Sequence, residues 1–529
     1  MLDLFGIINK VKSEKERLML ALDKIRTNKE IAPKRPAVIS GEKVLTYEEL
    51  WEGSGRLAYW LDERLGDNKE PIVVFGHKDP MMVVCFVAAI RSGRAYCPVD
   101  LSTPKQRVED VCKAVGNKIV LAPVQEDELE YKIPEGFHGI CLHELEEIAF
   151  GDGKFIEDGG IDKDHTHYII FTSGSTGKPK GVEITADALR SYTDWSATLG
   201  EGAVSQLEGE QEKAGKVFLN QAPFSFDLSV MDLYTALTCG GTVYCLTKEH
   251  QKDHRLMMDV LQKGSINYWV STPSFADMCL ADKEFDGSTF PDLKAFLFCG
   301  EKLTKATASK LLERFPKSKV INTYGPTEST VAVTEVQITG EMIDSPNDLP
   351  IGKVKPESFI KISDDTGEIL IGGMSLSKGY YKNPEKTNEA FFLDEEGNRW
   401  YHTGDTGFFE GDMLYYKGRI DFQVKLHGYR IELGDIESNL LEIEDIESAL
   451  VLPKYDEEGK IKHLVGFVVA GNSATALDKR QQMTLAKEIK NKLKKNIPEY
   501  MVPKKIQFLE QIPMTANGKA DRKKLEELI

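Results

Sequence analysis

Short runs of β-branched and aromatic residues alternate with helix-like segments along most of the chain. Residues 72–75, with the sequence Ile-Val-Val-Phe, predict a strand, and residues 81–90 predict a buried helix. The alternation continues through strand candidates at 118–121, 168–171, 217–219, 242–245, 268–270 and 296–298, with helical patterns at 228–237 and 255–263. Strands that alternate with helices are typical of layered α/β units on a largely parallel sheet. The sequence therefore predicts an α/β fold.

The pattern changes after about residue 351. Short strand-like pieces separated by glycine and aspartate indicate a more β-rich region. The last segment, from Gln423 to Ile529, has its own strand run at 464–470 and a lysine-rich helix at 485–495. Its length of about 100 residues is within the usual size of a domain. We expect a large N-terminal domain at 1–420, made of layered α/β subdomains plus a β-rich part, and a small α+β domain at 421–529.

The net charge and the cysteine content limit the partners and the cellular compartment that we expect for this chain. The 529 residues include 67 Lys and Arg against 84 Asp and Glu, a formal net charge of −17. This balance disfavours nucleic acid and an anionic membrane surface as partners, and the longest apolar stretch, 81–90, is far shorter than the ~20 residues of a membrane span. Eight scattered cysteines without a CxxC pair favour reduced thiols over a disulfide framework or a zinc site. We expect a cytoplasmic protein.

A loop rich in hydroxyl residues, glycine and lysine follows the apolar strand at 168–171. It has the sequence Thr172-Ser173-Gly174-Ser175-Thr176-Gly177-Lys178-Pro179-Lys180-Gly181. Glycines let backbone N–H groups approach a ligand closely, and the hydroxyls and lysines add donors and positive charge, which suits a polyphosphate. The spacing of Gly174 and Gly177, and Pro179 after the lysine, exclude a Walker A loop. A flexible polar turn is the alternative that composition alone leaves open.

Several further motifs occur in a fixed order along nearly the whole chain. They are Leu-Thr-Tyr-Glu-Glu-Leu at 45–50, Gly-Arg-Ala-Tyr-Cys-Pro-Val-Asp at 93–100, the loop at 172–181, Asn-Thr-Tyr-Gly-Pro-Thr-Glu at 322–328, Tyr-His-Thr-Gly-Asp at 401–405, Gly-Arg-Ile-Asp at 418–421 and Asn-Gly-Lys at 517–519. In this order they resemble the successive core motifs of the adenylate-forming enzymes. Within that family, residues 220–234 and 298–301 are most similar to the members that activate D-alanine.

The resemblance implies a ligase that forms carbon–sulfur bonds in two steps, with ATP and Mg²⁺. A carboxylate attacks the α-phosphate of ATP, and a thiol then attacks the acyl-adenylate. The implied substrate is D-alanine, and the implied acceptor is the phosphopantetheine thiol of a carrier protein supplied in trans, as in teichoic acid D-alanylation. Two alternatives stay open: an adenylating enzyme for another small amino acid, such as L-alanine, glycine or serine, and a non-catalytic ATP-binding regulator on the same fold.

The resemblance also implies roles on the nucleotide side. Glu328 would hold Mg²⁺, since a hard cation prefers carboxylate oxygen, and Lys519 would bridge the substrate carboxylate and the α-phosphate. Asp405 would accept the ribose hydroxyls, with Arg419 as a further contact. The remaining ATP contacts would come from Thr172, Ser173, Gly174, Ser175, Thr176, Gly177, Lys178, Asn322, Thr323, Tyr324, Gly325 and Thr327, with the Tyr324 ring stacked on adenine. Taken alone, most of these residues would be surface, turn or packing residues.

On the substrate side, Asp227 would bind the α-ammonium of the amino acid. Capping of the helix at 228–237 is the competing interpretation. Cys299 would shrink the pocket to a methyl side chain and crowd one face of Cα, although core packing is the ordinary role of a buried cysteine. The other pocket residues would be Phe226, Met231, Leu297, Gly300, Thr323 and Val331.

The resemblance places a hinge at Asp421. We expect the small domain to rotate between the two half-reactions, which removes Lys519 from the site and presents Gly428 on the inner face. No carrier-protein motif follows Lys519, so we expect a separate acceptor, with the basic segment 487–495 as a candidate docking surface.

Overall fold

The computed structural model describes residues 19–173, 179–200, 216–470, 477–514 and 521–529. One sheet of the N-terminal domain has the order β15-β14-β13-β12-β11-β9-β10-β1-β2. Its strands from β13 to β1 are parallel, and β2, β14 and β15 are antiparallel to their neighbours. The bounds are β1 Pro36–Ser40, β2 Lys43–Thr46, β9 Val217–Asn220, β10 Thr242–Cys245, β11 Tyr268–Ser271, β12 Ala295–Phe298, β13 Lys319–Tyr324, β14 Thr334–Gln337 and β15 Lys353–Val354.

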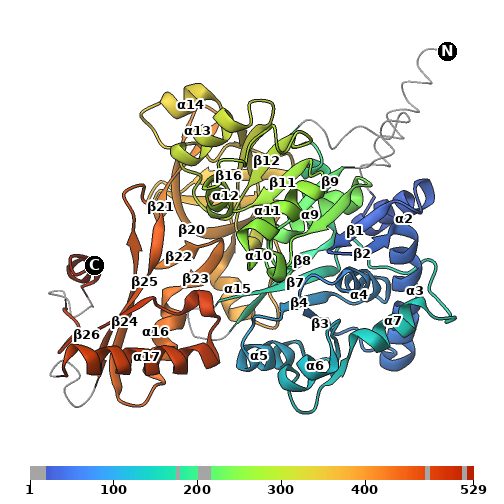
Figure 1. The fold of residues 1–529 in the computed structure, drawn as a ribbon, viewed down its shortest axis with the longest axis horizontal. Coiled ribbons are helices and arrows are strands. Elements are labelled where there is room, and N and C mark those ends of the chain that lie inside the picture. Colours follow the sequence, from blue (N-terminus) through green and yellow to red (C-terminus); the bar gives the residue numbers. More distant parts are fainter. Residues whose placement is uncertain (1–18, 174–178, 201–215, 471–476, 515–520) are drawn as a thin grey trace.

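A second sheet has the order β18-β8-β7-β4-β3-β5-β6. Strands β7, β4, β3, β5 and β6 are parallel, and β7 turns back antiparallel into β8 at the hydroxyl-rich loop. The bounds are β3 Ile72–Gly76, β4 Tyr96–Asp100, β5 Ile119–Leu121, β6 His138–Ile140, β7 Thr166–Thr172, β8 Lys180–Thr185 and β18 Gly379–Tyr380. Together the two sheets confirm the expected layered α/β architecture (Figure 1).

Helices cover both sheets and join them through one core. They are α2 Ala21–Ile31, α3 Tyr47–Leu65, α4 Pro80–Arg91, α5 Lys105–Val115, α6 Glu126–Lys132, α7 Leu142–Phe150, α8 Ala186–Ser196, α9 Leu228–Thr238, α10 Lys248–Gln251, α11 His254–Lys263, α12 Pro273–Leu280, α13 Lys305–Arg314 and α14 Gly340–Asp344, with the 3₁₀ turn η2 at Thr327–Ser329. Every residue of α4 is buried, as its apolar run predicts, and Asp79 caps its first turn by accepting from the Met81 amide.

The β-rich region forms an antiparallel sheet with the order β16-β17-β20-β19, and β21 pairs with β20. The bounds are β16 Ser358–Ile362, β17 Glu368–Gly373, β19 Phe391–Leu393, β20 Arg399–Glu410 and β21 Met413–Arg419, with helix α15 at Pro384–Ala390. The change of pattern after residue 351 is thereby confirmed. In the β20–β21 register Asp405 faces Arg419, so two predicted ATP contacts lie side by side.

The C-terminal part is α+β and has its own core, which includes Ile431, Leu440, Val451, Val468 and Leu493. It begins with the hairpin β22 Gln423–Leu426 and β23 Tyr429–Glu432, followed by α16 Leu433–Leu441, β24 Ile446–Tyr455, β25 Ile461–Ala470, α17 Lys479–Asn496, η4 Glu499–Met501, β26 Lys505–Phe508 and α18 Arg522–Glu526. These elements, orange to red in Figure 1, lie at one side of the larger domain. No described helix is long and apolar enough to cross a membrane.

Candidate active site

A cavity of about 120 Å³ lies where the β22–β23 hairpin meets the N-terminal domain. It brings together most of the predicted residues that the structure describes: Thr172, Ser173, Phe226, Asp227, Cys299, Gly300, Gly325, Thr327, Val331, Asp405 and Arg419. The C-terminal part adds Gly428, Arg430 and Tyr500 to the lining. Residues that are far apart in the sequence therefore converge on one small space.

Other predicted residues lie behind or beside this cavity. Met231 and Leu297 are buried in the same core cluster as Cys299 and Val331, but they do not line the cavity. Asn322, Thr323 and Tyr324 line an adjoining cleft between the two parts of the chain. The predicted residues Gly174, Ser175, Thr176, Gly177, Lys178 and Lys519 lie outside the described residues.

Asp227 presents a carboxylate that makes no ion pair with the described residues. It occupies the N-cap position of α9, yet its side chain makes no capping hydrogen bond. Instead it accepts a hydrogen bond of 2.6 Å from the Thr327 hydroxyl. Burial raises the pKa of Asp227, and the Thr327 bond only partly offsets this. A partly buried carboxylate that forms no ion pair with the described residues is suited to bind an ammonium group.

Cys299 forms part of the cavity wall next to a strained turn. Its Sγ donates to the Val331 carbonyl over 3.6 Å, and burial raises the pKa of the thiol, so the side chain is a small neutral group. Thr330 and Val331 have φ angles of 58° and 68°, an unusual conformation for β-branched residues. Such outliers persist only where surrounding structure holds them, and they often occur at functional sites.

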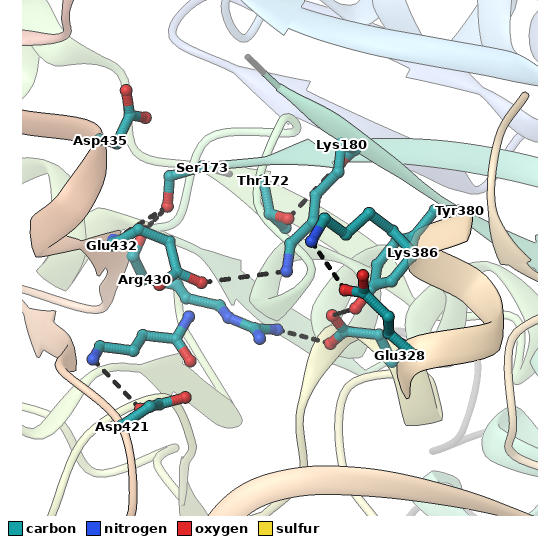
Figure 2. Close-up of polar contacts among 12 residues, drawn as sticks. Thr172, Ser173, Lys180, Glu328, Tyr380, Lys386, Asp421, Arg430, Glu432 and Asp435 are labelled. Atoms are coloured by element: carbon teal, nitrogen blue, oxygen red, sulfur yellow. Dashed lines mark hydrogen bonds and ion pairs between the residues drawn. The ribbon is translucent and has the colours of Figure 1, made fainter. Parts of the chain in front are cut away.

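Glu328 lies on η2 and is completely buried. Its Oε1 accepts from the Tyr380 hydroxyl at 2.7 Å, and its Oε2 pairs with Arg430 Nη1 at 2.5 Å (Figure 2). Burial alone would raise the pKa of Glu328, but Arg430 and Lys180 lower it to about 2. The described residues contain no cluster of three or more potential metal ligands. Glu328 is thus a buried, ionised carboxylate whose charge Arg430 compensates in this arrangement.

Asp405 is held by two groups that the sequence also singled out. It accepts from the Tyr324 hydroxyl at 2.6 Å and from Arg419 Nη1 at 2.6 Å. Arg419 also binds both carboxylate oxygens of Asp421, at 2.6 and 2.7 Å. The predicted hinge residue is therefore connected directly to the predicted ribose-binding pair.

The β22–β23 hairpin makes contacts that sequence analysis did not predict. Its turn residues His427 and Gly428 have φ angles of 52° and 80°, and a Cβ on Gly428 would lie 2.4 Å from Thr272 Cγ2. The Gly428 amide donates to Glu301 Oε1 at 2.8 Å, and the Tyr429 ring packs edge-on against Phe226. The sequence predicted only that Gly428 faces the site. It did not predict which residues the hairpin contacts, because a single Glu or Arg gives no indication of a partner that is distant in the sequence.

The same hairpin contacts the hydroxyl-rich loop. Ser173 Oγ donates to the Arg430 carbonyl at 2.9 Å and accepts from the Glu432 amide at 3.2 Å. Lys180 Nζ lies 3.9 Å from Glu432 Oε1. Burial and the nearby Arg430 lower the pKa of Lys180.

The chain belongs to the AMP-binding enzyme family: the family model matches residues 25–381, and the model of the AMP-binding enzyme C-terminal domain matches 435–519. It is 41% identical over 523 residues to a D-alanine–D-alanyl carrier protein ligase of Bacillus velezensis, covering 96% of this chain and 99% of the relative. The ligase of the same name from Bacillus licheniformis is 41% identical over 520 residues, with the same coverage.

Solved structures share the fold. An adenylation domain of Vibrio cholerae in complex with glycyl-adenosine-5′-phosphate superposes with a TM-score of 0.80 at 23% identity, covering 96% of this chain and 97% of that one. An o-succinylbenzoate CoA synthetase of Bacillus subtilis gives a TM-score of 0.79 at 19% identity, covering 95% and 98%.

Proposed function

We propose that the protein activates D-alanine with ATP and transfers it to the phosphopantetheine thiol of a separate carrier protein. Curated relatives with this activity in their name match nearly the full length of both chains. The observation that carries the proposal is the unpaired carboxylate of Asp227 in a small cavity beside Cys299. The carboxylate would bind the α-ammonium, and the small space would admit a methyl side chain and little more.

In the first half-reaction the substrate carboxylate would attack the α-phosphate and release pyrophosphate. The phosphates would lie along the loop at 172–181, and the ribose would lie at Asp405 and Arg419. Lys519 would stabilise the negative charge that develops between carboxylate and phosphate. Each of these groups binds or orients a reactant, so the residues act mainly by positioning and by electrostatics.

Glu328 fits the role of a Mg²⁺ ligand. It is buried and ionised, and it would be an uncompensated anion without a cation beside it. Sites of this kind supply one or two carboxylates and leave the remaining positions to phosphates and water. Bound there, the ion would neutralise charge on the phosphate oxygens.

In the second half-reaction the thiol would attack the acyl carbon, with loss of AMP and of the thiol proton. The arrangement described here, with Gly428 at the cavity and the hairpin against Phe226, suits this step. We propose the domain boundary at 420/421 and the hinge at Asp421, whose carboxylate accepts hydrogen bonds from Arg419, two residues earlier in the chain. The eight cysteines are free, which supports a reducing compartment such as the cytoplasm.

Amino-acid-dependent exchange of labelled pyrophosphate into ATP tests this function. The enzyme should use D-alanine in preference to L-alanine, glycine and D-serine. A preference for one of the other three would replace D-alanine with that amino acid. No exchange with any of them would favour the non-catalytic regulator.

A further inference from the structure

Lys78 is a buried lysine whose hydrogen bonds all go to the loop that leads to Asp227. It follows β3, and it is only 2% exposed. Its Nζ donates to the Asn220 carbonyl at 2.8 Å, to Asn220 Oδ1 at 2.5 Å and to the Ala222 carbonyl at 2.7 Å. An ammonium group has three donors. All three are therefore used on the last residue of β9 and on the loop that follows it.

Asn220 is in turn bonded to Asp232, a completely buried residue of α9. Asn220 Nδ2 donates to Asp232 Oδ1 at 2.6 Å, so the two ends of the segment that contains Asp227 are tied together. Burial raises the pKa of Asp232, and the positive charge of Lys78 partly offsets that rise. Asp227 lies between the two ends and lines the cavity. Lys78 therefore holds the base of the segment that presents Asp227 to the cavity.

The direction of these contacts points beyond support of the fold. A buried cation is expensive in free energy, and apolar residues fill a core at lower cost. Strand β3 belongs to one sheet and β9 to the other. Lys78 thus reaches from the first sheet to the second, and it makes its bonds at the loop that carries the ammonium-binding carboxylate.

We propose that Lys78 is a positioning residue for amino-acid binding: it fixes the loop after β9 so that the Asp227 carboxylate meets the α-ammonium of the substrate. The inference rests on the proposed function, in which Asp227 binds that ammonium. Lys78 lines neither the cavity nor the adjoining cleft, so it acts through Asp227 and touches no reactant. A misplacement of about 1 Å can cost on the order of 100-fold in rate, so the orientation of the carboxylate matters as well as its charge.

Lys78→Met tests this role, and Lys355→Met is the matched control. Lys355 is also 2% exposed, and it donates to the Ser191 hydroxyl at 2.9 Å and to the Pro356 carbonyl at 3.2 Å. Burial lowers the pKa of both lysines to about 8. Neither Lys355 nor its two partners line the cavity. Both variants therefore remove a buried ammonium group, but only one of them releases the loop.

Pyrophosphate exchange measures the Michaelis constants of both substrates. Lys78→Met should raise the KM for D-alanine about tenfold and the KM for ATP less than about twofold. Lys355→Met should change each constant by less than about twofold. An equal rise in the KM for D-alanine in both variants, or no rise in Lys78→Met, would overturn the proposal.

The double variant Lys78→Met/Asp227→Asn separates positioning from general support of the fold. If Lys78 acts through the carboxylate, its substitution should lower kcat/KM for D-alanine by less than about twofold once that carboxylate is gone. A loss of about tenfold in both backgrounds would show that the two residues act independently, and it would overturn the proposal.

Lys78→Gln keeps the proposal testable if Lys78→Met does not fold. Glutamine has two donors on a shorter side chain, so it can replace at most two of the three bonds. We expect a rise of about threefold in the KM for D-alanine and none in the KM for ATP. An unchanged KM for D-alanine in Lys78→Gln would contradict the positioning role.

D-alanine-dependent exchange by the wild type separates the two ideas. If exchange is absent, the proposed function fails, and the inference about Lys78 fails with it. If exchange is present and Lys78→Met behaves like Lys355→Met, only the inference about Lys78 fails.

Discussion

Replacing Asp227 with asparagine should remove most of the affinity for the amino acid while leaving the fold intact. Asparagine keeps the size of the side chain, and its amide oxygen can still accept the 2.6 Å hydrogen bond from Thr327. The Asp227 side chain makes no capping bond to α9, so the helix does not depend on the carboxylate. The substitution therefore removes a charge and little else.

The structure sets the size of the effect. Removing one partner of a buried charge pair costs about 3–5 kcal/mol. Asp227 is partly exposed to the cavity, so the lower end applies, and about 3 kcal/mol corresponds to a loss of roughly 150-fold in kcat/KM for D-alanine. Burial raises the pKa of Asp227, which means that the charged carboxylate lowers the free energy of unfolding of the protein. The melting temperature of Asp227→Asn should accordingly stay the same or rise.

Pyrophosphate exchange measures both substrates in one assay. The kcat/KM for ATP at saturating D-alanine should change far less than the kcat/KM for D-alanine. Thr327→Val is the matched control, since it removes the hydrogen bond but keeps the charge, and it should cost about 1 kcal/mol, or roughly fivefold. A loss for Asp227→Asn no larger than that of the control would refute the ammonium role.

Three further predictions concern the pocket, Glu328 and the hinge. Cys299→Ala should reduce the preference for D-alanine over L-alanine by about tenfold in exchange assays, and an unchanged ratio would mean that the thiol only packs. The pKa of Glu328 is lowered from 4.5 to about 2, so its contribution, about 3 kcal/mol, is complete above pH 4.5 and is lost as the pH falls toward 2. Glu328→Gln should therefore show a shallower fall in melting temperature over that interval, and parallel curves would argue against the ion pair. Asp421→Pro, compared with Asp421→Asn, should slow transfer to the carrier much more than pyrophosphate exchange, and an equal loss in both would count against the hinge.

Several strands and helices could be predicted from local sequence patterns. The strands β3, β7 and β12 and the helices α4 and α9 were predictable because each combines an apolar run with the period of its structure. The helix α17 begins six residues earlier than expected, at Lys479. Its start is fixed by a capping box between Asp478 and Gln481, a signal that the sequence does contain.

The contacts that complete the site could not be predicted in the same way. Glu328 and Arg430 are 102 residues apart in the sequence, and the residues around each of them do not indicate which residue it will contact. The pairing arises only when the hairpin docks on the larger domain. The sequence also could not predict how deeply each pocket residue is buried. Met231 and Leu297 were expected in the pocket, but they lie in the core cluster and do not line the cavity. Periodicity indicates which face of an element is buried, and it carries no information on which buried side chain borders a cavity.

A crystal structure with ATP and D-alanine bound would test the central claim most directly. We expect the ammonium nitrogen within hydrogen-bond distance of the Asp227 carboxylate, and the triphosphate along residues 173–181. An ammonium group distant from Asp227, or a triphosphate bound away from that loop, would contradict the account.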